Sequence, residues 1–308
     1  MSSFPIETDA AAPSSPAALR SGTPKSDYLL AICFLAPLVL VLLVFFLWPL
    51  FDSIVNSFHG HILGGIDRSK WTLANYRKLL EPFYLEILWR TFRISVITSA
   101  ITVVLAYPVA WYIAGLPPRS QAYWLLVFVA PWLVNVAVKA FGWSLILSGN
   151  GVINSTLRNL GIIDAPLHLM FNQTGIVIGL VHAHFMFVLL PLWAVFAGMD
   201  RSLIWAAENL GATRRQVFTK IILPLSLPAL LAGIVINFTM NMAAFATPAL
   251  LGGARARVIS YIAYQINLVD LNWPLGAAMA MLLLVVTLAI VYVSQKLMTS
   301  GRRKVMFT

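Results

Sequence analysis

Four polar side chains inside apolar runs are the first candidates for chemistry, namely His182, His184, Asn237 and Asn241. The two histidines stand two positions apart, which on a helix directs them to divergent faces and makes them poor joint metal ligands. They offer no nucleophile–base pair at helical spacing for covalent catalysis. The two asparagines stand four apart and share a helix face, and an amide at membrane depth must meet either a polar cavity or a partner helix. Two roles stay open for them: contact with a polar solute in a translocation pathway, or hydrogen bonding between helices.

The composition is that of a membrane protein. Hydrophobic residues make up 60% of the chain and charged residues 10%, with a mean hydropathy of +0.84, whereas soluble domains carry about 25% charge. The net charge of +10 resides mostly on residues that flank apolar runs, so we predict membrane lipid as a partner and no nucleic acid. The single cysteine, Cys33, and the histidines lack metal-site spacing, so we predict no metal.

Six apolar runs are each long enough to cross a hydrocarbon core of roughly 30 Å. We therefore predict an all-α, polytopic membrane helix bundle with six transmembrane helices. The predicted spans are residues 28–51, 89–114, 122–147, 175–198, 227–251 and 274–297. Residues 1–27, rich in Ser, Pro and Ala, are expected to form a disordered tail. The membrane domain is then 28–298, and 299–308 is a short basic tail.

The longest internal segment that alternates charge with helix-forming residues is 200–233, between the fourth and fifth spans. Its apolar residues at helical spacing are Leu203, Ala206, Ala207 and Leu210. Gly211 follows where a helix usually stops, and Thr213 with Gln216 has the spacing of a capping box that starts a second helix. Pro224 lacks an N–H and disfavours helix at Leu223, so we predict a bend there. A charged helix–turn–helix at a membrane surface indicates a docking element for a soluble partner.

This segment resembles the cytoplasmic loop of the permeases of ATP-binding-cassette (ABC) importers. The resemblance rests on the spacing A-A-x-x-L-G-A at Ala206, Ala207 and Gly211, and on I-L-P-L at Ile221, Leu223 and Pro224. In that family the loop forms a coupling helix that sits in a groove of the ATPase subunit. Trp205 stands where the family usually has Glu, and Glu208 lies one turn further on. The resemblance thus implies an ATPase-coupling role for Trp205, Ala206, Ala207, Glu208, Gly211, Leu223 and Pro224.

A second resemblance lies at residues 246–253 (ATPALLGG) and 272–278 (NWPLGAA). Together with the loop, these stretches look like permeases of the spermidine/putrescine type, a type I importer branch that also includes opine importers. Thr247 and Pro248 are expected to end the fifth span, and Trp273 with Pro274 to start the sixth. The likeness places the fifth span at the interface between two permeases, which favours Asn237, Asn241 and Thr247 as substrate-pathway residues.

The implied function is that of a permease subunit that conducts a small polar solute such as a polyamine. The implied partners are an ABC ATPase dimer, a second permease subunit and a periplasmic solute-binding protein. The chain itself lacks the G-x-x-x-x-G-K-[ST] loop that holds ATP phosphates, so we predict no cofactor, no enzymatic activity of its own, and ATP hydrolysis by a separate subunit. Opine, amino-acid-like and phosphonate solutes are also compatible, and the sequence does not distinguish a homodimer from a heterodimer.

The expected location is the bacterial inner membrane with both termini cytoplasmic. On that orientation eleven of the 21 basic residues lie inside and ten lie outside, so the positive-inside rule does not decide it. The basic C-terminus and the family resemblance decide it instead. Two other functions stay open: a stand-alone secondary carrier or channel, and an intramembrane enzyme that uses a histidine with Asn237.

Overall fold

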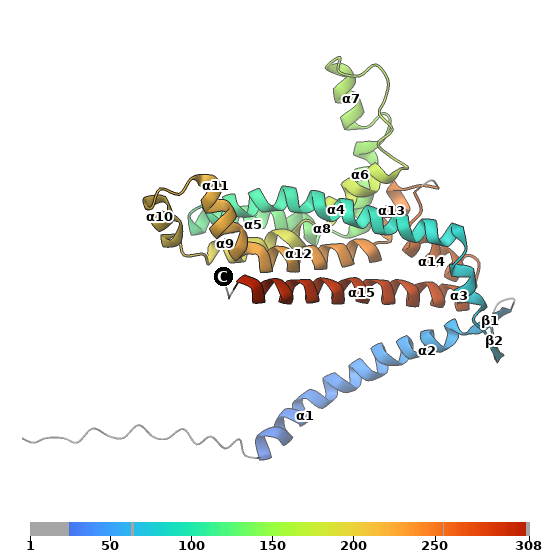
Figure 1. The fold of residues 1–308 in the computed structure, drawn as a ribbon. Helices are drawn as coiled ribbons and strands as arrows, with labels where there is room; N and C mark the ends of the chain where they lie inside the picture. Colours follow the sequence, from blue (N-terminus) through green and yellow to red (C-terminus); the bar gives the residue numbers. More distant parts are fainter. Residues whose placement is uncertain (1–24, 63–64, 255, 306–308) are drawn as a thin grey trace, which may run out of the picture. The chain divides into compact units, whose positions relative to one another are not determined.

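The computed structural model describes residues 25–62, 65–254 and 256–305, and it divides the chain into two units, 1–51 and 52–308 (Figure 1). The first unit contains α1 (Lys25–Leu42), the π-helical turn η1 (Leu43–Leu47) and the start of α2 (Trp48–Ser57). The predicted first span falls within this helix. Residues 1–24 of the predicted tail, and 306–308 at the other end, lie outside the described residues.

The second unit begins with a small polar structure where the sequence predicts only a loop. Strand β1 (His59–Ile62) pairs antiparallel with β2 (Gly65–Trp71), with a bulge after His59. The following helix, α3 (Ala74–Leu79), is fixed to this hairpin because the Asn75 amide donates to the carbonyls of Ser57 and His59, each at 2.9 Å. The strands have no apolar alternation, which is why hydropathy does not predict them.

Helix α4 (Pro82–Ala114) is the centre of the bundle and contacts α8, α9, α12 and α14. One buried stripe in its middle part follows a spacing of three and four residues and consists of small side chains. The residues of this stripe are Thr91, Ser95, Thr98, Thr102, Ala106 and Ala110. Small side chains let neighbouring helices approach closely, and this close packing stabilises helix association in lipid.

The predicted third span is broken. Helix α5 (Pro118–Leu133) ends at Val134, which is extended, and α6 (Val136–Leu147) starts beyond Asn135. The Asn135 side chain caps the new helix by accepting from the Ala137 amide at 2.8 Å, as expected of an asparagine N-cap. Helix α7 (Val152–Asn159) follows after a short turn, and α6 and α7 together make one candidate membrane span.

The predicted fourth span is bent by 42° between α8 (Gln173–His184) and α9 (Met186–Ala197). At the bend the Val188 amide donates to the Phe185 carbonyl at 3.2 Å, one residue short of the regular helical partner. The His184 carbonyl is thereby released from the helix ladder. A side chain at Gly233 would lie 3.2 Å from the Phe187 carbonyl oxygen, so this glycine allows the fifth span to pack directly on the bend.

The predicted end of the helix at Leu223 is wrong, although the chain changes direction between α11 and α12 (Figure 1). Helix α11 (Arg214–Val217), the π-turn η2 (Phe218–Ile222) and α12 (Leu223–Ala243) form one continuous helix of 30 residues. A π-turn widens the helix by one residue, which relieves the clash of the Pro224 ring with the carbonyl one turn earlier. The turn η1 stands in the same relation to Pro49. Both π-turns end two residues before a proline, as expected where local π adjustments accommodate proline in membrane helices.

The predicted end of the fifth span at Thr247–Pro248 is also wrong. Helix α12 ends at Ala243, and Thr247 and Pro248 belong to the separate short helix α13 (Ala246–Leu251). Helix α14 (Ile259–Leu268) leads to α15 (Trp273–Val305), where Asn272 accepts from the Leu275 amide at 3.2 Å and Pro274 lies in the first turn. The predicted start of the sixth span is therefore confirmed, although the helix continues past residue 297.

Five helical stretches within the described residues are long and apolar enough to cross a membrane, and the bent α8–α9 pair makes a sixth. They are Ile32–Ser57, Pro82–Ala114, Val136–Asn159, Arg214–Ala243 and Trp273–Lys296. The all-α membrane bundle is confirmed. Its interior cluster around α4 and α9 includes Ala106, Ala110, Val188, Leu189 and Leu192.

Candidate functional site

The loop between the fourth and fifth spans is a rigid helix–turn–helix. Helix α10 (Ser202–Asn209) ends in a Schellman motif, in which the Gly211 amide donates to Glu208 at 2.9 Å and the Ala212 amide to Ala207 at 3.0 Å. Gly211 has φ +83°, and no atom lies within 4 Å of the position that a Cβ would occupy. The requirement for glycine predicted here is therefore one of backbone conformation, since the space beside it is open.

Side chains accept from backbone amides at the starts of both helices in the loop. The predicted capping box is present, since the Gln216 amide donates to Thr213 Oγ1 at 3.4 Å and the Thr213 amide to Gln216 Oε1 at 2.8 Å. Asp200 precedes α10 and accepts from the Ser202 amide at 2.9 Å. Hydrogen bonds from the Ser202 backbone and side chain lower the pKa of the Asp200 carboxyl. The carboxylate is thus ionised at neutral pH and favours the helix start.

Polar contacts hold the loop against the end of α4. The Arg201 guanidinium donates to the Ala114 carbonyl at 3.0 Å, and so satisfies a carbonyl that a helix end leaves unpaired. Beside it, the Gln121 side chain donates to the Leu116 carbonyl at 2.8 Å and accepts from the Trp193 indole at 3.1 Å. These bonds fix the loop of residues 200–213, which we call the docking loop, to the α4–α5 turn and to α9. All three lie at the end of the bundle where α10 and α11 lie (Figure 1).

The apolar residues of α10 divide between two faces, rather than forming the single stripe of the sequence pattern. Ile204 and Ala207 pack against the interior cluster around α4 and α9. Leu203, Trp205 and Leu210 point away from it and are 47%, 61% and 89% exposed. We call these three residues, with the exposed Ala206 between them, the docking face. An exposed apolar patch on a polar loop marks an interaction surface.

The remaining predicted coupling residues lie behind or beside the docking face. Glu208 lines a cavity of about 610 Å³ between α4 and the loop, together with Arg214 and Trp111. Leu223 is half-buried and Pro224 is exposed, both in the first turn of α12 after the π-turn. Glu208 is nevertheless exposed and stands one helical turn after Trp205, at the edge of the docking face.

Asn237 and Asn241 do lie together, inside the chain, in a polar cluster with Ser99 and His184. Asn237 Oδ1 accepts from Ser99 Oγ at 3.0 Å and from Asn241 Nδ2 at 2.7 Å. Asn237 Nδ2 donates at 3.0 Å to the carbonyl of His184 that the bend in the fourth span releases. The His184 ring lies 2.7 Å from Asn241 Oδ1 through Nδ1. Ser99, Asn237 and Asn241 are all buried, so this arrangement favours hydrogen bonding between helices, and solute contact stays a prediction.

Thr247, the third predicted pathway residue, lies apart from this cluster. It is buried in α13, which packs tightly on α8, since a Cβ at Gly179 would lie 2.6 Å from Thr247 Cγ2. The G-x-x-x-G spacing at Gly175 and Gly179 therefore serves the close approach of α13 to α8. His182 instead contacts the Trp143 ring, at 5.6 Å between centroids. Within the described residues, no three His, Cys, Asp or Glu side chains gather as a metal site.

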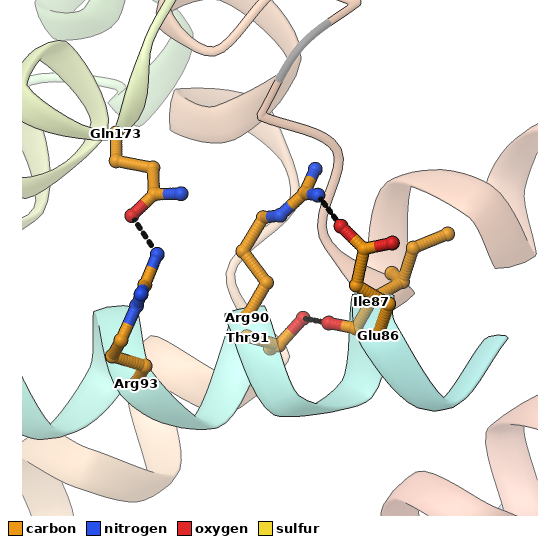
Figure 2. Close-up of polar contacts among 6 residues, drawn as sticks. All are labelled: Glu86, Ile87, Arg90, Thr91, Arg93 and Gln173. Carbon is orange, nitrogen blue, oxygen red and sulfur yellow. Dashed lines mark hydrogen bonds and ion pairs between the residues drawn. The ribbon is translucent and has the colours of Figure 1, made fainter. Parts of the chain in front are cut away.

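The sequence did not predict a polar band in the N-terminal part of α4, shown in Figure 2. Arg90 pairs with Glu86 one turn earlier, and Arg93 donates to Gln173 Oε1 at 2.7 Å. Thr91 donates to the Ile87 carbonyl at 2.8 Å and accepts from the Ile259 amide at 3.0 Å. These contacts fix the starts of α8 and α14 to α4. The spacing of Thr91, Ser95 and Ser99 along α4 was the signal that could have revealed a polar face here.

Comparison with known proteins places this geometry in a family. Residues 17–304 match the family described as the inner membrane component of binding-protein-dependent transport systems. The spermidine/putrescine transport system permease protein PotB of Escherichia coli (strain K12) is 34% identical over 216 residues, which cover 70% of this chain and 78% of that protein. The protein of the same name from Haemophilus influenzae is 30% identical over 234 residues, or 76% and 82% of the two chains.

The fold also matches solved structures. In the crystal structure of a bacterial ABC transporter involved in the import of the acidic polysaccharide alginate, one chain superposes with a TM-score of 0.71 at 20% identity. The match covers 89% of this chain and 96% of that chain. At this identity the likeness concerns the fold and not the solute.

Proposed function

We propose a specific role for this chain, which belongs to the family of inner membrane components of binding-protein-dependent transport systems: it forms part of the passage for a polyamine. It is a multi-pass inner-membrane permease subunit, and a transport subunit rather than an enzyme. A soluble binding protein delivers the solute, a second permease pairs with this one, and a separate ABC ATPase dimer supplies the energy. The 34% identity to a spermidine/putrescine permease supports the choice of solute.

The observation that carries the coupling role is the docking face. Leu203, Trp205 and Leu210 are exposed on a helix whose C-terminal end is closed by a Schellman motif and whose inner face is fixed to the bundle. A fixed helix with an exposed Trp has little ordering entropy left to lose on binding, which favours affinity. We infer that the docking face inserts into the ATPase, with the small Ala206 allowing close approach. Ala207 and Gly211 shape the loop, and Leu223 with Pro224 connects it to the fifth span.

The test is co-purification of the ATPase with a membrane complex that contains Trp205→Ala. Buried interface tryptophans often contribute at least about 2 kcal/mol, so we expect roughly thirty-fold weaker ATPase binding. Trp89→Ala is the matched control, because Trp89 is 62% exposed against 61% for Trp205 but lies near the outer end of α4. Equal ATPase retention in the two variants would show that Trp205 is not an interface residue.

We also propose that both termini are cytoplasmic. Helix α15 begins beside the β1–β2 hairpin and ends at the side of the bundle that carries α10 and α11 (Figure 1). If the docking loop meets a cytoplasmic ATPase, the C-terminus is cytoplasmic and the hairpin is periplasmic. The stretch Ile32–Ser57, which leads into the hairpin, crosses once and places the N-terminus inside. As part of this proposal, the membrane domain spans residues 28–298, and the segments on either side of it, 1–27 and 299–308, are cytoplasmic tails.

A further inference from the structure

The fifth span is interrupted where its surface is open. Helix α12 ends at Ala243, Ala244 is extended with ψ 128°, and α13 starts at Ala246. The Ala244 carbonyl is satisfied by Ser260 Oγ from α14, yet Phe245 is 37% exposed. Irregular backbone at membrane depth persists only where protein buries it or where it lines a water-filled cavity. The exposed side of this break therefore faces protein or water in the assembled transporter, and not lipid.

Three aromatic rings gather at the break. The Phe245 ring lies 4.6 Å from the Tyr264 ring and 6.4 Å from the Tyr261 ring, between centroids. Tyr261 and Tyr264 stand one turn apart on α14, and Gln265 fixes Tyr261 by donating to its hydroxyl at 3.2 Å. Tyr264 is 42% exposed. Phe245 and Tyr264 thus leave part of their aromatic surface on the open side of the break, and electron-rich rings attract cations.

The backbone adds a second source of negative potential. The break stands at the C-terminal end of α12, a helix of 21 residues, where the carbonyls of the last turn carry the negative end of the helix dipole. Helices α12, α13 and α14 contain no Lys, Arg, Asp or Glu. No basic side chain of these three helices therefore competes for the site, while Arg257 lies in the connection between α13 and α14. The attraction of a cation would come from the rings and the helix-end carbonyls.

We propose that the break at Ala244–Phe245 is an ammonium-binding position on the solute pathway, where an amine of the solute lies over Phe245 and Tyr264. The proposal rests on the proposed function, because that function supplies an amine as solute. It differs from the predicted pathway residues Asn237 and Asn241, whose side chains are occupied by partners inside the chain. Weak binding suits a transit position, since a solute must also leave it.

The experiment is uptake of labelled putrescine by the complete importer in proteoliposomes, with KM and maximal rate measured separately. Phe245→Leu and Tyr264→Leu keep an apolar side chain but remove the ring. We expect KM to rise by about three- to thirty-fold in each, the range of a cation–π contact. Tyr264→Phe keeps the ring and should stay near the wild-type KM. Tyr292→Leu removes an exposed tyrosine from α15 and serves as the matched control with unchanged KM.

A fluorination series at position 245 separates ring electrostatics from packing. Adding one, two and three fluorines to the Phe245 ring preserves its shape and progressively reduces the negative electrostatic potential of its face. KM should therefore rise stepwise while assembly is unchanged. A flat series overturns the proposal, even if the Leu variants fail to assemble. If the wild-type importer takes up putrescine but both Leu variants retain its KM, only this proposal fails. If the wild-type importer does not take up putrescine, the polyamine assignment fails and this proposal with it.

Discussion

Asn237→Leu provides the sharpest test of the polar cluster. Leucine is close to asparagine in size and adds no group that can replace the amide. The substitution removes one hydrogen-bond partner from each of three groups: Ser99 Oγ, Asn241 Nδ2 and the His184 carbonyl, which lie 3.0, 2.7 and 3.0 Å from the Asn237 amide atoms. Ser99 and His184 belong to α4 and α8, so the effect should appear as loss of packing of α4 and the α8–α9 bend on α12.

The magnitude follows from hydrogen bonds in membrane bundles. Each contributes about 0.6 kcal/mol on average and up to about 1.7, so three lost bonds give roughly 2–5 kcal/mol. Asn237 is already fully buried, and lipid gives no hydrophobic drive that the leucine could recover. For a chain of this size 1 kcal/mol corresponds to about 2–4 °C in the unfolding midpoint, so we expect a decrease of roughly 4–20 °C.

The assay is the thermal midpoint of the purified complex, measured by loss of the monodisperse species, beside putrescine uptake. Thr98→Val is the matched control, because Thr98 is also fully buried and neighbours Ser99, yet its hydroxyl has no hydrogen-bond partner within the described residues. Removing an unsatisfied buried hydroxyl should change the midpoint by about 1 °C or less, or raise it.

The opposite result would refute the reasoning. If Asn237→Leu lowers the midpoint no more than Thr98→Val but changes which solutes are carried, the side chain contacts solute and the cluster in this structure does not hold the bundle together. The same two outcomes distinguish the roles of Asn241 when it is replaced by leucine, because the Asn241 amide also bonds Ser99 and His184.

Two further predictions concern the docking loop and the topology. Gly211→Ala should destabilise the loop by about 1 kcal/mol because residue 211 has a φ of +83°, but the added Cβ meets no clash. The chain should therefore insert normally while more ATP is hydrolysed per solute carried. Ala207→Arg adds bulk against the bundle and should have a larger effect, and unchanged coupling in both variants would show that the loop does not couple ATP hydrolysis to transport. Of two reporter enzymes fused after Thr308, the one that functions only in the cytoplasm should be active and the one that functions only in the periplasm should be inactive. The reverse result would overturn the proposed orientation.

The sequence predicted the helix ends that side-chain chemistry determines locally. Gly211, the Thr213–Gln216 box and Pro274 all lie where expected, because a left-handed turn, an orphan amide and a missing N–H each require a particular residue type. The same local rules failed at Pro224, where a π-turn absorbs the proline without ending the helix. Whether a proline ends or is accommodated in a helix depends on neighbouring helices, which a single sequence does not show.

The sequence did not predict the breaks inside apolar runs, because hydropathy carries no information on the backbone conformation of an apolar residue. Val134 and Ala244 are both extended in stretches that are apolar on either side. The polar cluster was half predicted: the spacing of Asn237 and Asn241 placed them on one face, but their partners Ser99 and His184 come from helices more than 50 residues away in sequence. Only the bend of the fourth span brings the His184 carbonyl to them.

The continuity of the helix at Pro224 has a mechanical consequence. If the helix ended at Leu223, irregular backbone would join the docking loop to the fifth span, and motion of the loop would be lost there. With the π-turn, α11, η2 and α12 form one uninterrupted helix of 30 residues. One end carries Arg214 and the turn at Gly211, beside the docking face, and the other is the break at Ala244. We infer that a displacement of the loop by the ATPase is carried along this helix toward the break. There the Ala244 carbonyl accepts from Ser260 of α14, and α14 is also bonded to α4 through Thr91, so the displacement would change the contact between Phe245 and Tyr264. The bend of the fourth span, which Gly233 and Asn237 join to α12, would move with the same helix.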